Sequence, residues 1–251
     1  MGILSKTELL HELYKVGEGK ANSRFDRLAI LSVFAGVFIS LSAFSYIVIN
    51  TGMSALNPTY AKFISGICFS FGLFAVVVSG GELFTGNILL VAPFLAKKIT
   101  FPKMIRNWVV VYLFNFIGAI FISLCVYYSS LTTPQMYQFL HKICIVKTAS
   151  PWLELLFKGI GCNILVCLGV WMTYASKDAV GKFFACLMSI IVFLVCGFEH
   201  SIANMFYLVF AYITKDISLG AMFYDLVPVT VGNIIGGALV AIGYYFAYRE
   251  Q

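Results

Sequence analysis

Charged residues are scarce in this sequence. Only 11% of its 251 residues are Asp, Glu, Lys or Arg, whereas 61% are hydrophobic. Soluble domains carry about 25% charged residues, so this balance excludes an ordinary soluble domain and indicates a chain that lies in a lipid bilayer. The net charge of +6 is not accompanied by a basic stripe interleaved with aromatic residues. We therefore expect no nucleic-acid partner.

Motifs for metal binding and catalysis are also missing. The seven cysteines form no CxxC pair and six of them fall in apolar segments, which excludes a disulfide framework or a zinc site. HExxH, GxSxG and nucleotide-binding motifs are absent, and Glu199-His200 has no partner at ligand spacing. We expect no cofactor, and an intramembrane enzyme is a poor interpretation.

Long apolar runs are what the sequence does contain. A helix that crosses a bilayer needs about 20 mostly apolar residues. Six segments meet this criterion, at 28–49, 61–96, 106–128, 154–175, 181–213 and 226–248. The second and the fifth are too long for one straight span, and each is interrupted by a glycine-bearing polar stretch. We predict that these two helices are broken.

The distribution of basic residues predicts the orientation. Twelve of the 17 Lys and Arg residues fall before the first segment, in the loops after the second and fourth segments, and at the C-terminus. Basic loops face the cytoplasm, so both termini are expected there, in a multi-pass protein of the cell membrane. Before the first segment, Ser5 and Glu8 form a possible capping box and three leucines follow at helical spacing. We expect an amphipathic helix that lies on the membrane surface.

The two interruptions repeat each other. Glu82 and Asn87 of the first match Glu199 and Asn204 of the second at an offset of 117, and two Asn-x-x-Gly stretches, at 115–118 and 233–236, follow at 118. Three spans per half is an odd number, so the second half must be inverted. The fold class is thus an all-α membrane protein with two inverted three-helix repeats. We divide it into a cytoplasmic N-terminal segment (1–27), a first repeat (28–128), an extracytoplasmic connection (129–153) and a second repeat with a short cytoplasmic C-terminus (154–251).

The breaks are the predicted site. Backbone groups freed by a broken helix survive in a membrane only against protein or a polar cavity. His200, an ionisable residue in mid-membrane, is expected in the pathway, with a structural hydrogen bond as the alternative. The Thr85 hydroxyl could face the pathway or satisfy broken backbone. Glu82 and Glu199 precede the second half-helices, where we expect them to cap free N–H groups.

Lysines and aromatic residues supply further candidates. Lys158 lies on the side where the charge rule predicts no lysine, so it either faces a vestibule that attracts anions or anchors the helix at the interface. Phe69 and Leu73 share one helix face, and Phe193 lies seven residues before His200. These three residues could form apolar constrictions or simply pack.

The two breaks resemble the signatures of the formate–nitrite transporter family. The matching residues are Gly80-Gly81-Glu82-Leu83-Phe84-Thr85-Gly86-Asn87 and Phe198-Glu199-His200-Ser201-Ile202-Ala203-Asn204-Met205. Further matches begin at Lys158-Gly159 and at Pro228-Val229, and the similarity runs from about 17 to 248. In overall appearance the chain is nearest to the hydrosulfide channel branch.

The resemblance implies an aquaporin-like protomer in a homopentamer that conducts formate, nitrite or hydrosulfide (HS⁻). It further implies a pathway at His200, Thr85 and Asn233, vestibule lysines at Lys20 and Lys158, and constrictions formed by Phe69, Leu73, Leu83, Phe84 and Phe193. We therefore predict a passive or proton-linked channel for small monovalent anions of weak acids, hydrosulfide or formate foremost. The alternative is a pore for neutral solutes of the aquaglyceroporin type. That type carries two Asn-Pro-Ala boxes, whereas the only Asn-Pro here is Asn57-Pro58.

Overall fold

The chain is helical throughout the part that the structure, a computed structural model, describes: residues 4–53 and 57–249. These ranges contain no β-strand. The outermost residues of the predicted 1–27 and 154–251 segments lie outside the described ranges. The elements are α1 (Lys6–Ala21), α2 (Phe25–Gly52), α3 (Pro58–Ser79), α4 (Phe84–Asn87), the 3₁₀ helix η1 (Ile88–Leu90), α5 (Val91–Leu95), α6 (Phe101–Tyr128), α7 (Pro134–Ala149), α8 (Trp152–Tyr174), α9 (Ala179–Cys196), α10 (Ser201–Ile213) and α11 (Leu219–Tyr248).

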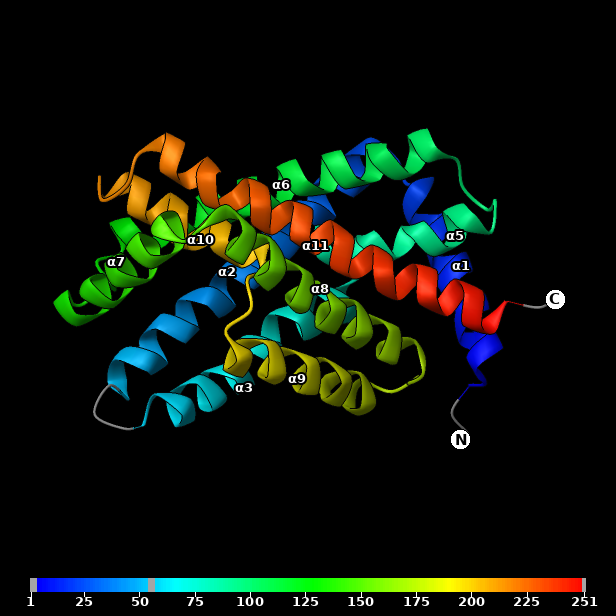
Figure 1. The fold of residues 1–251 in the computed structure, drawn as a ribbon, viewed down its shortest axis with the longest axis horizontal. Coiled ribbons are helices and arrows are strands. Elements are labelled where there is room, and N and C mark those ends of the chain that lie inside the picture. Colours follow the sequence, from blue (N-terminus) through cyan, green and yellow to red (C-terminus); the bar gives the residue numbers. More distant parts are fainter. Residues whose placement is uncertain (1–3, 54–56, 250–251) are drawn as a thin grey trace.

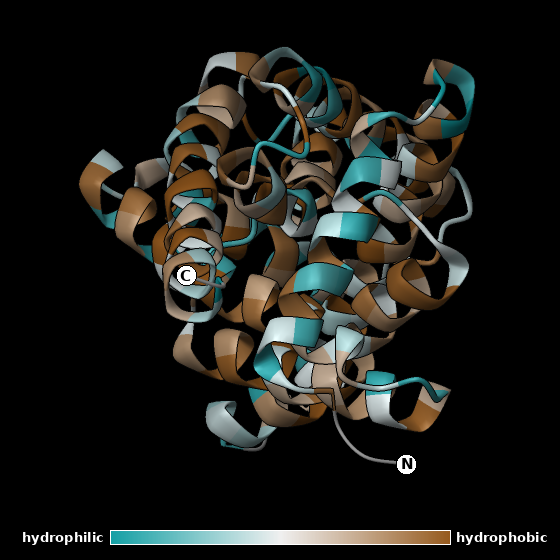
Figure 2. Cartoon of the chain, turned by 90° about the vertical axis from the view of Figure 1, so that its right-hand side faces the viewer, coloured by the Kyte–Doolittle hydropathy of each residue, from teal (hydrophilic) through white to brown (hydrophobic). Residues whose placement is uncertain are grey.

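Six of these helices are long and apolar enough to cross a membrane. They are α2, α3, α6, α8, α9 and α11, with mean hydropathy between 1.8 and 2.5 over their most apolar windows. Large apolar side chains such as Phe34, Phe121 and Phe157 are exposed on the outer surface, where lipid tails would cover them. The predicted count of six spans is confirmed. Figure 2 shows the resulting bundle, mostly hydrophobic with hydrophilic stretches among its helices.

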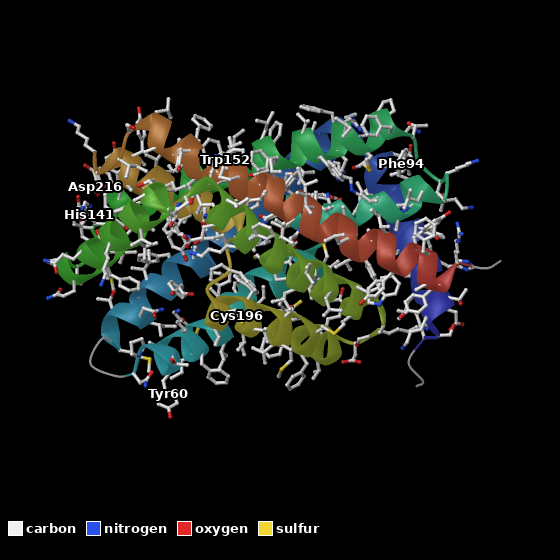
Figure 3. The ribbon with its side chains drawn as sticks, in the orientation of Figure 1. Tyr60, Phe94, His141, Trp152, Cys196 and Asp216 are labelled. Carbon is white, nitrogen blue, oxygen red and sulfur yellow. The ribbon has the colours of Figure 1, made fainter. Side chains whose placement is uncertain are left out.

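Both predicted helix breaks are present. Gly80 (φ +74°) follows the last residue of α3, and Gly197 (φ +75°) follows the last residue of α9. This left-handed conformation is open to glycine at little cost, which explains why each interruption begins with one. Extended residues then lead to α4 and α10, the second half-helices. Figure 3 labels Cys196, the last residue of α9, from which the chain turns towards α10.

The two halves enter the bundle from opposite ends. In Figure 1, α1 and the last turns of α11 lie at the right, whereas α7 lies at the left. We name these the α1 end and the α7 end. α2 follows α1, α8 follows α7, and the two helices run in opposite directions, as an inverted repeat requires.

Glycines bring the outer helices of each half into close contact. A Cβ atom on Gly36 of α2 would lie 2.2 Å from the backbone oxygen of Asn115 in α6. In the second half, a Cβ on Gly232 of α11 would lie 2.2 Å from the backbone oxygen of Leu156 in α8. Close glycine contacts thus hold the outer helices together within each half, and they bring Asn115 and Asn233 beside the breaks.

The N-terminal helix α1 is present, but it packs against a different surface from the one predicted. The capping box of Ser5 and Glu8 is present at the start of α1. However, Leu9, Leu10 and Leu13 are almost fully buried against the protein, with exposed fractions of 1–2%. The apolar stripe of α1 packs on α5, α6, α8 and α11 instead of on the membrane surface, because the ends of these helices offer it a protein partner.

α7 is the counterpart of α1 at the other end. It lies within the 129–153 connection, for which no helix was predicted. Thr133 caps its first turn. Asp216, in the connection between α10 and α11, accepts a hydrogen bond from Tyr137 Oη (2.6 Å) and lies 3.2 Å from His141 Nδ1 (Figure 3). These contacts tie α7 to the bundle.

Candidate transport pathway

The two breaks meet at Thr85 and His200. Thr85 Oγ1 lies 2.9 Å from His200 Nε2, and both side chains are buried. His200 Nδ1 accepts the backbone N–H of Ala203 at 3.2 Å, which caps α10. A ring nitrogen that accepts carries no proton, so His200 is neutral in this geometry and donates from Nε2 to Thr85. The hydroxyl hydrogen of Thr85 is thereby left as a donor for another group.

Apolar side chains flank this pair. The Phe193 ring is stacked with His200 at a centroid distance of 6.1 Å, and Phe69 meets Phe193 edge-on at 5.9 Å. Leu73 and Leu83 are also buried. Phe84, by contrast, packs against Tyr112 of α6 at 4.9 Å. Phe193 thus lies beside His200 and Phe69 packs on Phe193, whereas Phe84 turns towards α6.

A cavity leads from the α1 end to the first break. Its volume is about 450 Å³, and its lining includes the basic residues Lys20, Arg27 and Lys182. Leu73 and Leu83 also line this cavity, together with the backbone of the first break. Its acidic lining residues are Glu12 and Glu82, so basic side chains outnumber acidic ones in the cavity.

Two asparagines satisfy the broken backbone. Asn115 accepts from the N–H of Phe84 (3.0 Å) and donates to the carbonyls of Ser32 (2.7 Å) and Glu82 (2.9 Å). Asn233 makes the equivalent three bonds in the second half, with Ser201 N–H, Gly159 O and Glu199 O. The amide of Asn233 is therefore fully used, and it has no free hydrogen for a solute. Asn233 therefore stabilises the backbone of the second break, next to His200.

The glutamates of the two breaks bind lysines rather than capping helices. Glu82 accepts from Lys20 Nζ (2.9 Å) and Asn87 Nδ2 (2.6 Å). Glu199 accepts from Lys147 Nζ and from Asn204 Nδ2. The expected capping role belongs instead to the asparagines 115 and 233 and to His200, because those groups reach the free N–H groups directly. Asn87 and Asn204, which we interpret as structural residues of the breaks, contact the breaks through these glutamates.

Sequence comparison identifies the family. The family model described as Formate/nitrite transporter matches residues 7–247. The chain belongs to the formate/nitrite transporter family. It is 35% identical to the formate channel FocA of Haemophilus influenzae, over 92% of this chain and 89% of that protein.

Solved structures of the formate/nitrite transporter family have the same fold. One described as an FNT family ion channel has a TM-score of 0.86 and 25% identity, and covers 97% of this chain and 98% of its own. Another, described as a pentameric formate channel with formate bound, has a TM-score of 0.78 and 30% identity, covering 89% and 97%. The chain is therefore a multi-pass membrane protein of a channel and transporter family.

The two lysines predicted for the vestibules have different surroundings. Lys20 lies in the cavity and binds Glu82. Lys158 pairs with Glu154, one helical turn earlier on α8, and both side chains are partly exposed. The lysine that binds Glu199 is Lys147 of α7, a residue that was not predicted for the site. Burial lowers the pKa of the Lys147 ammonium, but the carboxylates of Glu199 and Asp225 raise it more, so it stays charged.

Lys147 could have been found from the repeat. The N–H of Glu82 donates to Leu31 O, and that of Glu199 donates to Lys158 O, both at 3.2 Å. The first helices of the two halves are therefore related by an offset of 127, rather than the 117 of the breaks. Moving from Lys20 by 127 positions reaches Lys147.

Proposed function

We propose that this protein is a channel for small monovalent anions of weak acids in the cell membrane, with formate as the first candidate. The observation that carries the proposal is the Thr85–His200 pair, buried between apolar side chains and approached through a basic cavity. Formate ranks ahead of hydrosulfide and nitrite because relatives at 35% and 33% identity are named formate channels. Hydrosulfide remains to be tested by flux.

Two lysine networks, one built on Lys20 and Glu82 and the other on Lys147 and Glu199, concentrate the anion at the two entrances. In each network the glutamate binds the lysine and fixes its ammonium group beside the break. By the charge rule for loops, the α1 end faces the cytoplasm and the α7 end faces outward. The protein then works in both directions along the same path, and the solute gradient sets the net flux.

The apolar section selects the protonated form. A bare anion loses its hydration there at a large cost in free energy, whereas a neutral weak acid loses far less. The Thr85 hydroxyl donates to the anion and His200 holds the oxygen of that hydroxyl in place. Since Nδ1 of His200 accepts from Ala203, the proton that accompanies the anion comes from solution or bound water and is released beyond the second constriction.

We further propose that the protomer assembles as a homopentamer. One of the solved family structures is described as pentameric, and its fold covers 89% of this chain. Each protomer contains its own Thr85–His200 pair, so each would carry an independent pathway.

Flux into proteoliposomes tests the function. Formate, nitrite, hydrosulfide and glycerol are supplied in parallel to vesicles that contain the purified oligomer and an internal pH indicator. Anion uptake well above empty vesicles, with internal acidification on formate entry, supports the proposal. Glycerol uptake as fast as formate, or no anion uptake by an intact oligomer, contradicts it.

Two Thr85 variants provide a matched control. Thr85→Ser keeps the hydroxyl and Thr85→Val keeps the shape. We expect Thr85→Ser to retain most of the formate flux and Thr85→Val to lose at least about tenfold, the value of one buried hydrogen bond. Equal flux in the two variants would remove the hydroxyl from the mechanism.

A further inference from the structure

Each lysine network extends through an asparagine to one further residue, and the two networks have the same residue types except at this last position. At the α1 end, Asn87 Nδ2 donates to Glu82 and to Asn107 Oδ1 (2.9 Å). At the α7 end, Asn204 Nδ2 donates to Glu199 and to Asp225 Oδ1 (2.9 Å). Asp225 lies 118 positions after Asn107, the offset that also relates Asn115 to Asn233. A carboxyl group thus stands where the first half has an amide.

Both polar atoms of the Asn107 amide have a hydrogen-bond partner, whereas only one of the two carboxyl oxygens of Asp225 has one. Asn107 Nδ2 donates to the backbone carbonyl of Lys20 at 3.2 Å. The matching carbonyl is that of Lys147, in the last turns of α7. Asp225 Oδ2 has no hydrogen-bond partner among the described residues, and Asp225 is completely buried. An ionised carboxylate can only accept, so it cannot reproduce the bond that Asn107 donates.

The charges around Asp225 do not balance when it is ionised. The titratable groups that face it are Lys147 and Cys144 from α7, Glu199 from the second break, Lys158 from α8 and Tyr112 from α6. Lys158 is already paired with Glu154. Lys147 is therefore the main positive charge that acts on two carboxylates, whereas Lys20 has only Glu82 in the corresponding network. Two buried carboxylates that share one cation favour binding of a proton.

We propose that Asp225 is a proton-binding site that makes anion entry from the α7 end depend on the pH at that end. With a proton on Oδ2, Asp225 gains the donor that Asn107 has, and the α7 network carries one positive and one negative charge, as the α1 network does. Without that proton, an extra negative charge lies beside Lys147 and repels the anion. The α1 end has Asn107 instead, so entry from that end lacks this dependence. The second part of this inference rests on the proposed anion-channel function.

Infrared difference spectroscopy tests the proton site without any transport. The purified oligomer is titrated from about pH 8 to about pH 5, and the carbonyl stretch of a protonated carboxyl group is followed. We expect a band that appears in the wild type and is missing in Asp225→Asn. Asn107→Asp, which copies the α7 network at the α1 end, should add a second band. Absence of the wild-type band, or its persistence in Asp225→Asn, overturns the proposal.

Flux measurements test the consequence. Formate entry from the α7 end is compared between wild type and Asp225→Asn in vesicles of known protein orientation. The readout is the entry rate of the wild type divided by that of Asp225→Asn, because the fraction of formate present as formic acid changes with pH equally for both proteins. We expect this ratio to fall by on the order of tenfold as the pH rises, the effect of one unit charge at roughly 10 Å in an effective dielectric of 20.

The outcomes separate the two proposals. A ratio that is constant with pH overturns the effect on entry. If neither protein conducts formate, the channel proposal fails, and the infrared band alone still decides whether Asp225 binds a proton. Asn107→Asp supplies the converse test, since it should create pH dependence for entry from the α1 end.

Discussion

The closest helix contact in the first half offers a demanding test of the packing. In Gly36→Ala the new Cβ would lie 2.2 Å from the backbone oxygen of Asn115, whereas ordinary contact begins at 3.4 Å. A side chain could rotate away, but a helix backbone cannot. α2 and α6 must therefore move apart by roughly 1 Å, a shift that overpacking data place at about 1–3 kcal/mol or more.

The matched control is Gly243→Ala in α11. Nothing lies within 4 Å of the Cβ position there. Alanine is the better helix former by about 0.8–1 kcal/mol, so this variant should keep or raise stability. The same gain applies to Gly36→Ala but is exceeded by the clash. We expect the two variants to differ by about 1–3 kcal/mol.

Reversible unfolding in mixed micelles, followed by circular dichroism, measures the difference. Formate flux is measured on the same preparations, since Asn115 also binds both sides of the first break. We expect Gly36→Ala to lose both stability and flux. If Gly36→Ala were as stable as Gly243→Ala, the close approach of α2 to α6 would be refuted.

Three further substitutions address the site. Asn115→Leu leaves Phe84 N–H and Glu82 O without their side-chain partner, so stability should fall by about 2–5 kcal/mol, measured by the same unfolding assay; an unchanged value would show that water replaces the amide. Lys147→Met removes the partner of a buried carboxylate and should cost about 3–5 kcal/mol, whereas Lys158→Met should cost under about 1 kcal/mol because its pair is exposed. Since the pKa of Lys147 is raised, its contribution is complete below the ordinary lysine value of about 10.4 and is lost only as pH rises through the higher folded-state value, which an alkaline unfolding titration detects.

The spans and breaks were predictable because their signals are local. Apolar length alone locates the six spans, and a glycine followed by polar residues marks both breaks. The motif repeat also located His200 and Thr85, whose contact the structure then provides at 2.9 Å.

Partners set by long-range packing were not predictable in the same way. Glu82 and Glu199 sit at the right place for capping, but Asn115 and Asn233 reach the free N–H groups first. Lys158 and Lys147 are both predicted on the non-cytoplasmic side of the membrane. Only the position of α7 in the fold decides that Lys147 binds Glu199. The repeat contained that information at an offset of 127, which differs from the motif offset of 117 mainly because α2 and α3 are longer than their counterparts α8 and α9.

The two second half-helices differ in stiffness. His200 precedes α10, a continuous helix of 13 residues, whereas Thr85 lies in α4, which has only four residues and is followed by η1 and α5 as separate short pieces. Short, irregular helical pieces have fewer continuous backbone bonds to resist bending than a regular helix. The hinge of this molecule is therefore expected on the Thr85 side. We expect His200 to stay in place while Thr85 moves relative to it, so that the two inverted halves share an architecture but differ in mobility.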